Sequence, residues 1–446
     1  MKFKREVTLL VVPFVLHMLI SNSFSFIDTL MITGLGEVAV ASIAAASQFT
    51  FVLGMVLSAT YGMSAFITQF YGINQMNNVY RTMGLMLVTS LFFSVLAFII
   101  VTVFKEQLLS FFINDEQGIA YGVQYVSVIV FVFILNAIKD TFGHALGAIG
   151  KIKVNVVFGC IGMGLNTLFN YLLIYGIGWF PAYEVKGAAI ATLLSTIISL
   201  LLLVGFIYGR RYYLHARFDQ LFSFNWSFCK RVYKTIYPLV LHEGIWSLGN
   251  MLYAVAFGHM GIVALATFQL ARIFNQYFLM GISGFSYAAR VMIGRKLSSE
   301  DPSAAITNAR EFTKLAIYSA IVVSVLIILL NPLIVSLFAQ LSPEVQRTFQ
   351  NVLYIQGVVL TMYFLNHLWI VGVFRSGGDN VFSMKLVLCT TWFIALPLVF
   401  LGAYVFHWSI ELVYFMFALE EITKSIFGYF RYRSNKWARN LVQDFS

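Results

Sequence analysis

Residues 187–209 read GAAIATLLSTIISLLLLVGFIYG, a stretch without a single charged side chain. About 20 apolar residues in a helix cross a bilayer, because each residue rises about 1.5 Å and the hydrocarbon core is about 30 Å thick. Comparable stretches recur along the whole chain of 446 residues, which is 60% hydrophobic and only 11% charged. The sequence therefore predicts an all-α protein that crosses the membrane many times.

The apolar stretches predict twelve transmembrane helices. The first six lie near Val7–Thr33, Ala39–Tyr71, Thr82–Phe104, Ala120–Gly143, Val154–Ile177 and Gly187–Gly209. The last six lie near Val232–Phe257, Ile262–Ile293, Phe312–Phe338, Val345–Phe374, Val381–Phe406 and Ser409–Phe430. The first helix follows basic residues, as a signal peptide does, but it is too long and lacks an Ala-x-Ala cleavage pattern. We therefore expect it to be retained.

Basic residues gather in alternate loops. Most of them lie in 1–5, 210–234, 290–314 and 431–439, whereas the opposite loops hold only Lys105, Lys186 and Arg347. Because cytoplasmic loops are rich in Lys and Arg, we expect a multi-pass protein of the cell membrane with both termini in the cytoplasm. The net charge of +10 follows from this pattern and from contact with anionic lipids of the bilayer. It does not indicate a nucleic-acid partner.

The chain contains two similar halves of six helices each. Residues 13–17 (PFVLH) open the first helix, and residues 238–242 (PLVLH) open the seventh, 225 residues later. Each half makes an even number of crossings, so both insert in the same orientation and form a parallel 6+6 repeat. We expect an N-terminal lobe, a cytoplasmic linker and a C-terminal lobe, at 1–215, 216–231 and 232–446.

Four strings of the sequence resemble the multidrug and toxic compound extrusion (MATE) transporters. They are DTLMITGLG at 28–36, which begins fifteen residues after Pro13, KGAAIAT at 186–192, PLVLHEGIWSLG at 238–249 and FRSGGD at 374–379. They occur in order, so the resemblance covers essentially the whole chain. It implies a V-shaped protein whose two six-helix lobes enclose a central cavity. It also implies a secondary active antiporter that exports organic, often cationic, small molecules in exchange for Na⁺ or H⁺ by alternating access.

Asp28 and Glu243 are acids that lie inside predicted helices, away from their ends. Asp28 lies about six residues from the outer end of the first helix, and Glu243 lies about ten residues into the seventh. A charged group at the centre of a membrane helix costs at least ~2.5–3.5 kcal/mol, so such groups are generally functional. We expect both acids to couple transport to a proton or cation. The alternative is a structural carboxyl that is protonated and hydrogen-bonded to a neighbouring helix.

Asp28 has polar companions on other helices. Asn166 and Asn170 are four residues apart and share one helix face, and Thr192 lies in the sixth helix. Carboxylate, amide and hydroxyl oxygens suit a hard cation, so we expect all four residues to take part in coupling. Na⁺, held by Asp28, Asn166 and Asn170, is the candidate metal ion. Related cation sites often have Asp where this chain has Asn170, which weakens that expectation. Interhelical hydrogen bonding is the alternative for the two Asn, and a bond within its own helix for Thr192.

Other polar residues in the predicted helices have separate interpretations. The candidates for the substrate cavity are Trp246, Asn250, Gln269 and Asn366. Arg272 pairs with a carboxylate or a backbone carbonyl, or extends to the membrane surface; the sequence leaves this open. Lys424 follows Glu420 by four residues, so we expect a local ion pair, and we interpret Lys139 and Asp140 in the same way. Pro13 leaves one backbone carbonyl unbonded, which makes it a candidate hinge.

The sequence also argues against other classes of function. There is no P-loop motif, so we expect no ATP hydrolysis, and the seven His are scattered singly. We therefore expect neither catalytic residues nor a cofactor, apart from Na⁺ as a coupling ion. The nearest alternative is a lipid-linked oligosaccharide flippase of the same superfamily, which usually has more basic residues in its cavity. An integral-membrane enzyme is the alternative from a different class, and it would require clustered His, Asp or Ser.

Overall fold

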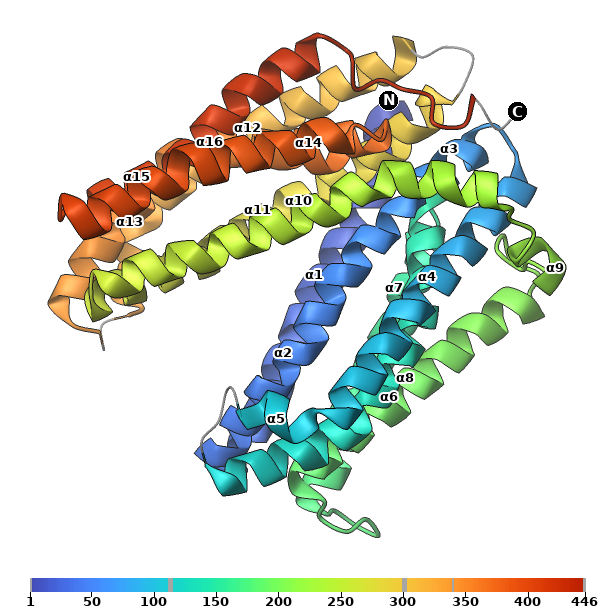
Figure 1. The fold of residues 1–446 in the computed structure, drawn as a ribbon, viewed down its shortest axis with the longest axis horizontal. Coiled ribbons are helices and arrows are strands. Elements are labelled where there is room, and N and C mark those ends of the chain that lie inside the picture. Colours follow the sequence, from blue (N-terminus) through green and yellow to red (C-terminus); the bar gives the residue numbers. More distant parts are fainter. Residues whose placement is uncertain (1, 111–114, 299–302, 339–340, 444–446) are drawn as a thin grey trace. The chain divides into compact units, whose positions relative to one another are not determined.

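The computed structural model describes residues 2–110, 115–298, 303–338 and 341–443. These residues form helices joined by short loops and contain no strand. Figure 1 labels the helices along the chain. The first half contains α1 (Lys2–Thr33), α2 (Glu37–Thr60), η1 (Tyr61–Met63), α3 (Ser64–Gly72), α4 (Met76–Val103), α5 (Lys105–Ser110), α6 (Glu116–Ala148), α7 (Ile152–Tyr175), α8 (Glu184–Gly209) and α9 (Phe218–Leu221). Each of the first six predicted helices has a counterpart here. The segments α2, η1 and α3 follow one another directly and together match the second predicted helix.

The second half repeats this organisation and also contains π-helical segments. It contains α10 (Trp226–His259), α11 (Ile262–Leu297), α12 (Ser303–Ser336), α13 (Pro343–His367), η2 (Leu368–Phe374), α14 (Asn380–Val387), η3 (Leu388–Ala395), α15 (Leu396–Phe400), η4 (Leu401–Val405) and α16 (Ile410–Arg433). The segments η2, η3 and η4 are π-helical. They continue α13, α14 and α15, so the tenth and eleventh predicted helices are each interrupted by π-helical turns. Such turns are rare and often lie at functional sites.

Nine helices in the described part of the chain are long and apolar enough to cross a membrane. The other three predicted helices correspond to α10, α11 and α16, which are 34, 36 and 24 residues long. They are long enough, but they contain more polar side chains, among them Glu243, Arg272 and Glu420. Polar residues of membrane helices usually face the protein interior. The composition of these three helices therefore points to polar sites in the second half.

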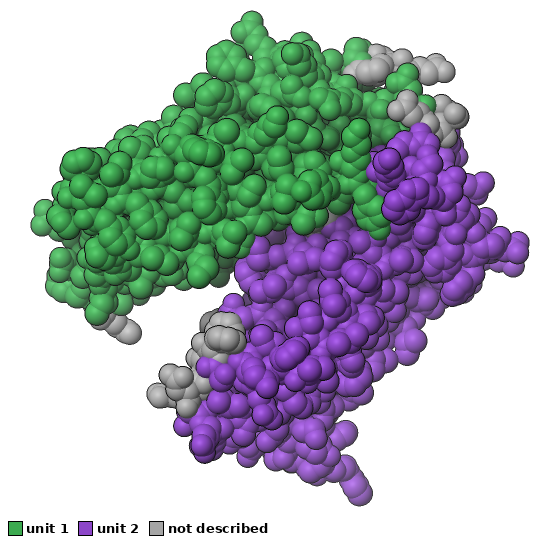
Figure 2. Space-filling model, in the orientation of Figure 1, with its two compact units in different colours: residues 1–11, 233–446 green, residues 12–232 purple. Residues whose placement is uncertain are grey.

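The described chain divides into two compact units, which Figure 2 colours separately. The N-terminal unit is Val12–Val232, and the C-terminal unit is Met1–Val11 with Tyr233–Ser446. The start of α1 thus packs with the later half of the chain, where the Phe3 and Phe312 rings meet edge to face at 5.2 Å between centroids. The lobe boundaries given by the sequence stay a prediction.

In the N-terminal unit, the segment expected to be a cytoplasmic linker packs closely against α4. A Cβ atom on Gly84 would lie only 1.8 Å from the Leu221 carbonyl oxygen of α9. The Arg81 guanidinium lies 4.7 Å from the centroid of the Phe228 ring, a cation–π contact. The segment is therefore held at the end of the helices rather than free in solution.

Candidate functional site

In the N-terminal unit, Asp28 of α1 contacts two amides of α7. Asn170 donates from Nδ2 to Asp28 Oδ1 at 3.0 Å. The contacts of Asn166 are satisfied when its amide nitrogen faces Asp28 Oδ2 at 2.8 Å and its oxygen faces Thr192 Oγ1 at 3.2 Å. Thr192 belongs to α8 and also donates to the Ala188 carbonyl at 3.0 Å. The structure thus brings Asp28, Asn166, Asn170 and Thr192 together.

This arrangement presents hydrogen-bond donors to the Asp28 carboxylate. Asn170 points an N–H group at it, and Asn166 does so in its satisfied orientation; such bonds stabilise the negative charge. The other amide atom of Asn170, Oδ1, is buried and has no hydrogen-bond partner among the described residues. A hard cation needs several oxygen ligands directed at it, so both amides would have to turn before they could bind Na⁺. A proton on Asp28 requires no such change.

A polar cavity of about 370 Å³ borders this group, between α1, α6, α7 and α8. Its wall includes Asp28, Asn166 and Thr192, and also the rings of Phe24 and Phe158. Pockets for small molecules are typically ~300–1,000 Å³. Carboxylates and aromatic faces both attract positive charge. The cavity therefore has the size and the chemistry to accept an organic cation.

Lys139 and Asp140 of α6 also line this cavity. The sequence predicts a local pair for these two residues and does not place them at the site. Asn136, one turn earlier, lies on the same wall. The spacing of three and four residues puts these positions on one helix face, and this polar stripe in an apolar helix is the signal that would have found them. The cavity thus contains two carboxylates and one ammonium group.

In the C-terminal unit, Glu243 of α10 forms an ion pair with Arg375. Arg375 Nη2 lies 2.6 Å from Glu243 Oε1, and His242 Nδ1 lies 3.5 Å from the same oxygen. The side chains of Arg375 and Glu243 are only 16% and 21% exposed. The sequence predicts a role for Glu243 but not for Arg375, which follows η2 at the end of the tenth predicted helix. A partner within the chain therefore compensates the charge of Glu243.

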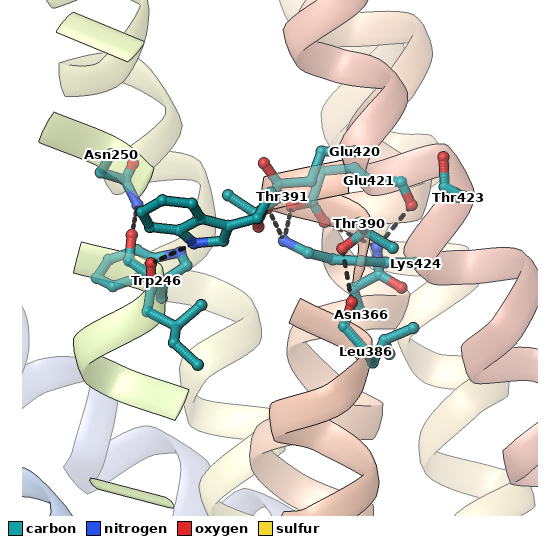
Figure 3. Close-up of polar contacts among 12 residues, drawn as sticks. Trp246, Asn250, Asn366, Leu386, Thr390, Thr391, Glu420, Glu421, Thr423 and Lys424 are labelled. Atoms are coloured by element: carbon teal, nitrogen blue, oxygen red, sulfur yellow. Dashed lines mark hydrogen bonds and ion pairs between the residues drawn. The ribbon is translucent and has the colours of Figure 1, made fainter. Parts of the chain in front are cut away.

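The four predicted cavity residues lie in different surroundings. On α10, Trp246 is 44% exposed, and Asn250 donates to its backbone carbonyl at 2.8 Å (Figure 3). Gln269 is exposed on α11. Asn366 is only 4% exposed and donates to Glu421 Oε2 at 2.7 Å. Asn366 thus lies in a buried polar cluster and does not line the cavity beside Asp28.

The environment of Arg272 was left open by the sequence. Its side chain is exposed on α11. Its guanidinium lies 5.9 Å from the centroid of the Phe268 ring, within the range of about 6 Å for a cation–π contact. An aromatic face is therefore the contact that the structure gives this residue.

The buried cluster that contains Asn366 is centred on α16. Lys424 Nζ lies 2.5 Å from Glu420 and 2.8 Å from Glu421, so the predicted local pairing is present. Tyr253 of α10 donates to Glu420, and Thr391 of η3 donates to the same carboxylate at 2.6 Å. Figure 3 shows Thr391, Glu420, Glu421 and Lys424 of this group. The contacts from other helices were missed, because only the spacing within α16 is visible in the sequence.

Comparisons with known proteins agree on one family. The family profile described as MatE matches residues 13–172 and 238–419. An uncharacterized transporter of Bacillus subtilis, YisQ, is 23% identical over 424 residues, which cover 95% of this chain and 91% of the relative. The probable multidrug resistance protein NorM of Thermotoga maritima is 21% identical over 446 residues, with 99% and 94% covered.

A solved structure agrees with the fold. The crystal structure of a MATE protein in its bent conformation has a TM-score of 0.87, at 18% identity, with 97% of this chain and 95% of that chain covered. The two matched segments of the family profile begin at Pro13 and at Pro238, which are equivalent prolines in the two halves of the repeat. The fold is thus the two-lobe fold of twelve membrane helices. The chain belongs to the MATE family, whose members are multi-pass membrane transporters rather than enzymes.

Proposed function

We propose that this protein is a secondary active antiporter that exports organic, often cationic, small molecules in exchange for protons. The observation that carries the proposal is the Asp28 carboxylate, which Asn166 and Asn170 hold at the wall of a polar cavity. The similarity to a probable multidrug resistance protein supports this class of substrate. The proposal requires neither ATP nor a cofactor.

Asp28 links the two transported species because a carboxylate pairs either with a proton or with a cationic substrate. The ionised form attracts positive charge in the cavity, and the protonated form does not. Proton binding therefore weakens substrate binding. Reciprocal linkage requires that substrate weakens proton binding by the same factor, so entry of one drives release of the other.

The choice of proton over Na⁺ rests on the donors around Asp28. Asn170 donates to Asp28, and the satisfied orientation of Asn166 does so as well. A site built for a metal ion would direct oxygen atoms, not N–H groups, toward the ion. Na⁺ coupling is the alternative that the experiment below distinguishes.

Transport also requires that the cavity open to either side of the membrane in turn. We propose that the two six-helix lobes of the family fold rock against one another, as in other transporters built from repeats. Pro13 is the proposed hinge, since it lies inside α1, next to the boundary between the two units at Val11 and Val12. The basic loops support a place in the cell membrane with both termini in the cytoplasm.

Transport into vesicles tests this function. The purified protein is reconstituted into liposomes, and uptake of tetraphenylphosphonium is followed under an imposed pH gradient and, separately, an imposed Na⁺ gradient. We expect the pH gradient alone to drive accumulation. Accumulation driven only by the Na⁺ gradient would show that Na⁺, not the proton, is the coupling ion. No accumulation under either gradient would contradict the proposal for organic cations.

A further inference from the structure

A second group of titratable side chains lies in the C-terminal unit, outside the site around Asp28. Glu420, Glu421 and Lys424 are close to the middle of α16, and their side chains are 6%, 12% and 5% exposed. One ammonium thus faces two carboxylates, which leaves one negative charge in excess if both are ionised. Unpaired charge in a buried site is strongly unfavourable. The cluster therefore needs one more positive charge.

The two carboxylates receive different numbers of hydrogen bonds. Glu420 accepts from Lys424, Thr391 and Tyr253. Glu421 accepts from Lys424 and from Asn366 at 2.7 Å. Hydrogen bonds from donors favour the charged form of a carboxylate. Glu420, with three donors, is consequently the acid held as an anion, and Glu421, with two, is the acid that accepts the extra positive charge.

The neighbours of Glu421 suit a proton better than a metal ion. The contacts to the two carboxylates come from an ammonium, two hydroxyls and an amide N–H. These groups all donate, whereas a metal ion needs oxygen lone pairs directed at it. The Asn366 oxygen is also occupied, because Ser425 donates to it at 3.0 Å. A proton on a carboxyl oxygen needs no ring of ligands.

One buried acceptor near the cluster remains without a partner. Tyr363 of α13 is 8% exposed, and its hydroxyl has no hydrogen-bond partner among the described residues. It interacts electrostatically with both Glu421 and Glu420. A tyrosine hydroxyl can donate or accept a hydrogen bond, so Tyr363 can accept one from a protonated carboxyl of the cluster. The π-helical segment η3, which supplies Thr391, is a further mark of a functional site.

We propose that Glu421 is a second proton-binding site of the transporter, which exchanges one proton in the C-terminal unit independently of Asp28. The titratable and charged groups around it are Tyr253 of α10, Tyr363 of α13, and Glu420 and Lys424 of α16. Proton binding at Glu421 is a property of this cluster. Only its use in transport rests on the proposed function.

Infrared spectroscopy tests the proton directly. Spectra of the reconstituted protein at acidic and at alkaline pH are subtracted, and the C=O band of protonated carboxyl groups is followed. We expect Glu421→Gln to remove one component of this band that Asp28→Asn leaves intact. Glu411→Gln is the matched control, because Glu411 lies on the same helix and also accepts from an Asn amide, that of Asn351, at 2.9 Å. An unchanged band in Glu421→Gln overturns the proposal.

A second variant keeps the test decisive if Glu421→Gln does not fold. Lys424→Gln removes the only ammonium of the cluster and leaves two carboxylates side by side. With a proton already on Glu421, this substitution leaves Glu420 as a buried anion without a compensating charge, which is strongly unfavourable, so we expect an additional protonated carboxyl in the spectrum at neutral pH. A spectrum identical to that of the unsubstituted protein contradicts the proposed cluster charge.

Transport shows whether the proton is used. With tetraphenylphosphonium as the probe, we expect Glu421→Gln to keep exchange without a gradient but to lower the number of protons moved per probe by about half. An unchanged ratio overturns the role in transport. If the unsubstituted protein moves no probe at all, the proposed function fails, while the infrared result still decides whether Glu421 binds a proton.

Discussion

Glu243 and Arg375 form an ion pair whose closest atoms, Oε1 and Nη2, are 2.6 Å apart. The pair joins α10 to the turn after η2, two segments that are far apart in sequence. Both side chains are largely buried, so each charge depends on the other. An acid inside a membrane helix is thus compensated without a bound cation, and the role of Glu243 in coupling stays a prediction.

The first prediction concerns this pair. We expect Glu243→Gln and Arg375→Gln each to lower the free energy of unfolding by ~1–3 kcal/mol, because each leaves a buried charge without its charge-assisted hydrogen bond. The double substitution should cost less than the sum of the two. Thermal unfolding in detergent measures the three variants. Strictly additive losses would show that the residues do not interact.

The second prediction concerns Asp28, whose carboxylate is the proposed switch. Asp28→Asn keeps the size of the side chain and removes its charge, so a pH step should no longer release bound substrate. We expect release of tetraphenylphosphonium on acidification to fall to the background level, measured by equilibrium dialysis of the purified protein. Preserved release would show that another acid couples proton binding to substrate release.

The control for Asp28→Asn is the same substitution at Asp219. This residue belongs to the N-terminal unit, but its side chain is 68% exposed and pairs with Arg217 on the surface. Surface ion pairs contribute little. Asp219→Asn should therefore bind and release the probe like the unsubstituted protein.

The third prediction concerns Asn170, whose amide is replaced by a carboxylate. Asn170 Nδ2 lies 3.0 Å from Asp28 Oδ1, so Asn170→Asp places a second carboxylate beside the first. Two adjacent carboxylates attract a cation, and we expect this variant to gain binding of Na⁺. At a Na⁺ concentration of about 100 times the Kd, binding stabilises the fold by ~2.7 kcal/mol. Unfolding temperatures in NaCl and choline chloride measure the effect, and equal temperatures would contradict it.

The sequence was sufficient for the fold because the bilayer imposes a simple rule on it. A stretch such as Gly187–Gly209 has one stable solution in a membrane, a helix, since every backbone polar group must be satisfied within the segment. The observed α8, Glu184–Gly209, therefore agrees closely with that prediction. The repeated Pro at 13 and 238 also indicated the two halves. Neither argument could reveal π-helical turns such as η3, which depend on packing.

The sequence was less informative about the sites, for a physical reason. Asn166 and Asn170 could be paired because they lie four residues apart on one helix. The partner of Glu243 is 132 residues away in the chain, and no periodicity links the two. The same holds for Tyr253 and Glu420. Contacts between helices depend on how the helices pack, and a single sequence does not contain that information.

The C-terminal tail docks on the turn after η2 at a glycine. A Cβ atom on Gly377 would lie 1.9 Å from the Trp437 carbonyl oxygen, and Trp437 is fully buried. In the same turn, Asp379 pairs with Arg431 at 2.6 Å. Only a residue without a side chain permits this close approach. The tail is thus part of the packed C-terminal unit and holds the turn that carries Arg375.

The fourth prediction tests this docking. Gly377→Ala forces the tail away from the turn, because backbone cannot approach a Cβ atom so closely, and we expect it to lower the free energy of unfolding by ~1–3 kcal/mol. Gly281→Ala is the control, since a Cβ atom there meets nothing within 4 Å and alanine favours a helix interior by about 0.5–1 kcal/mol. The control should unfold at the same or a higher temperature. If both variants unfold alike, the tail contributes nothing to stability.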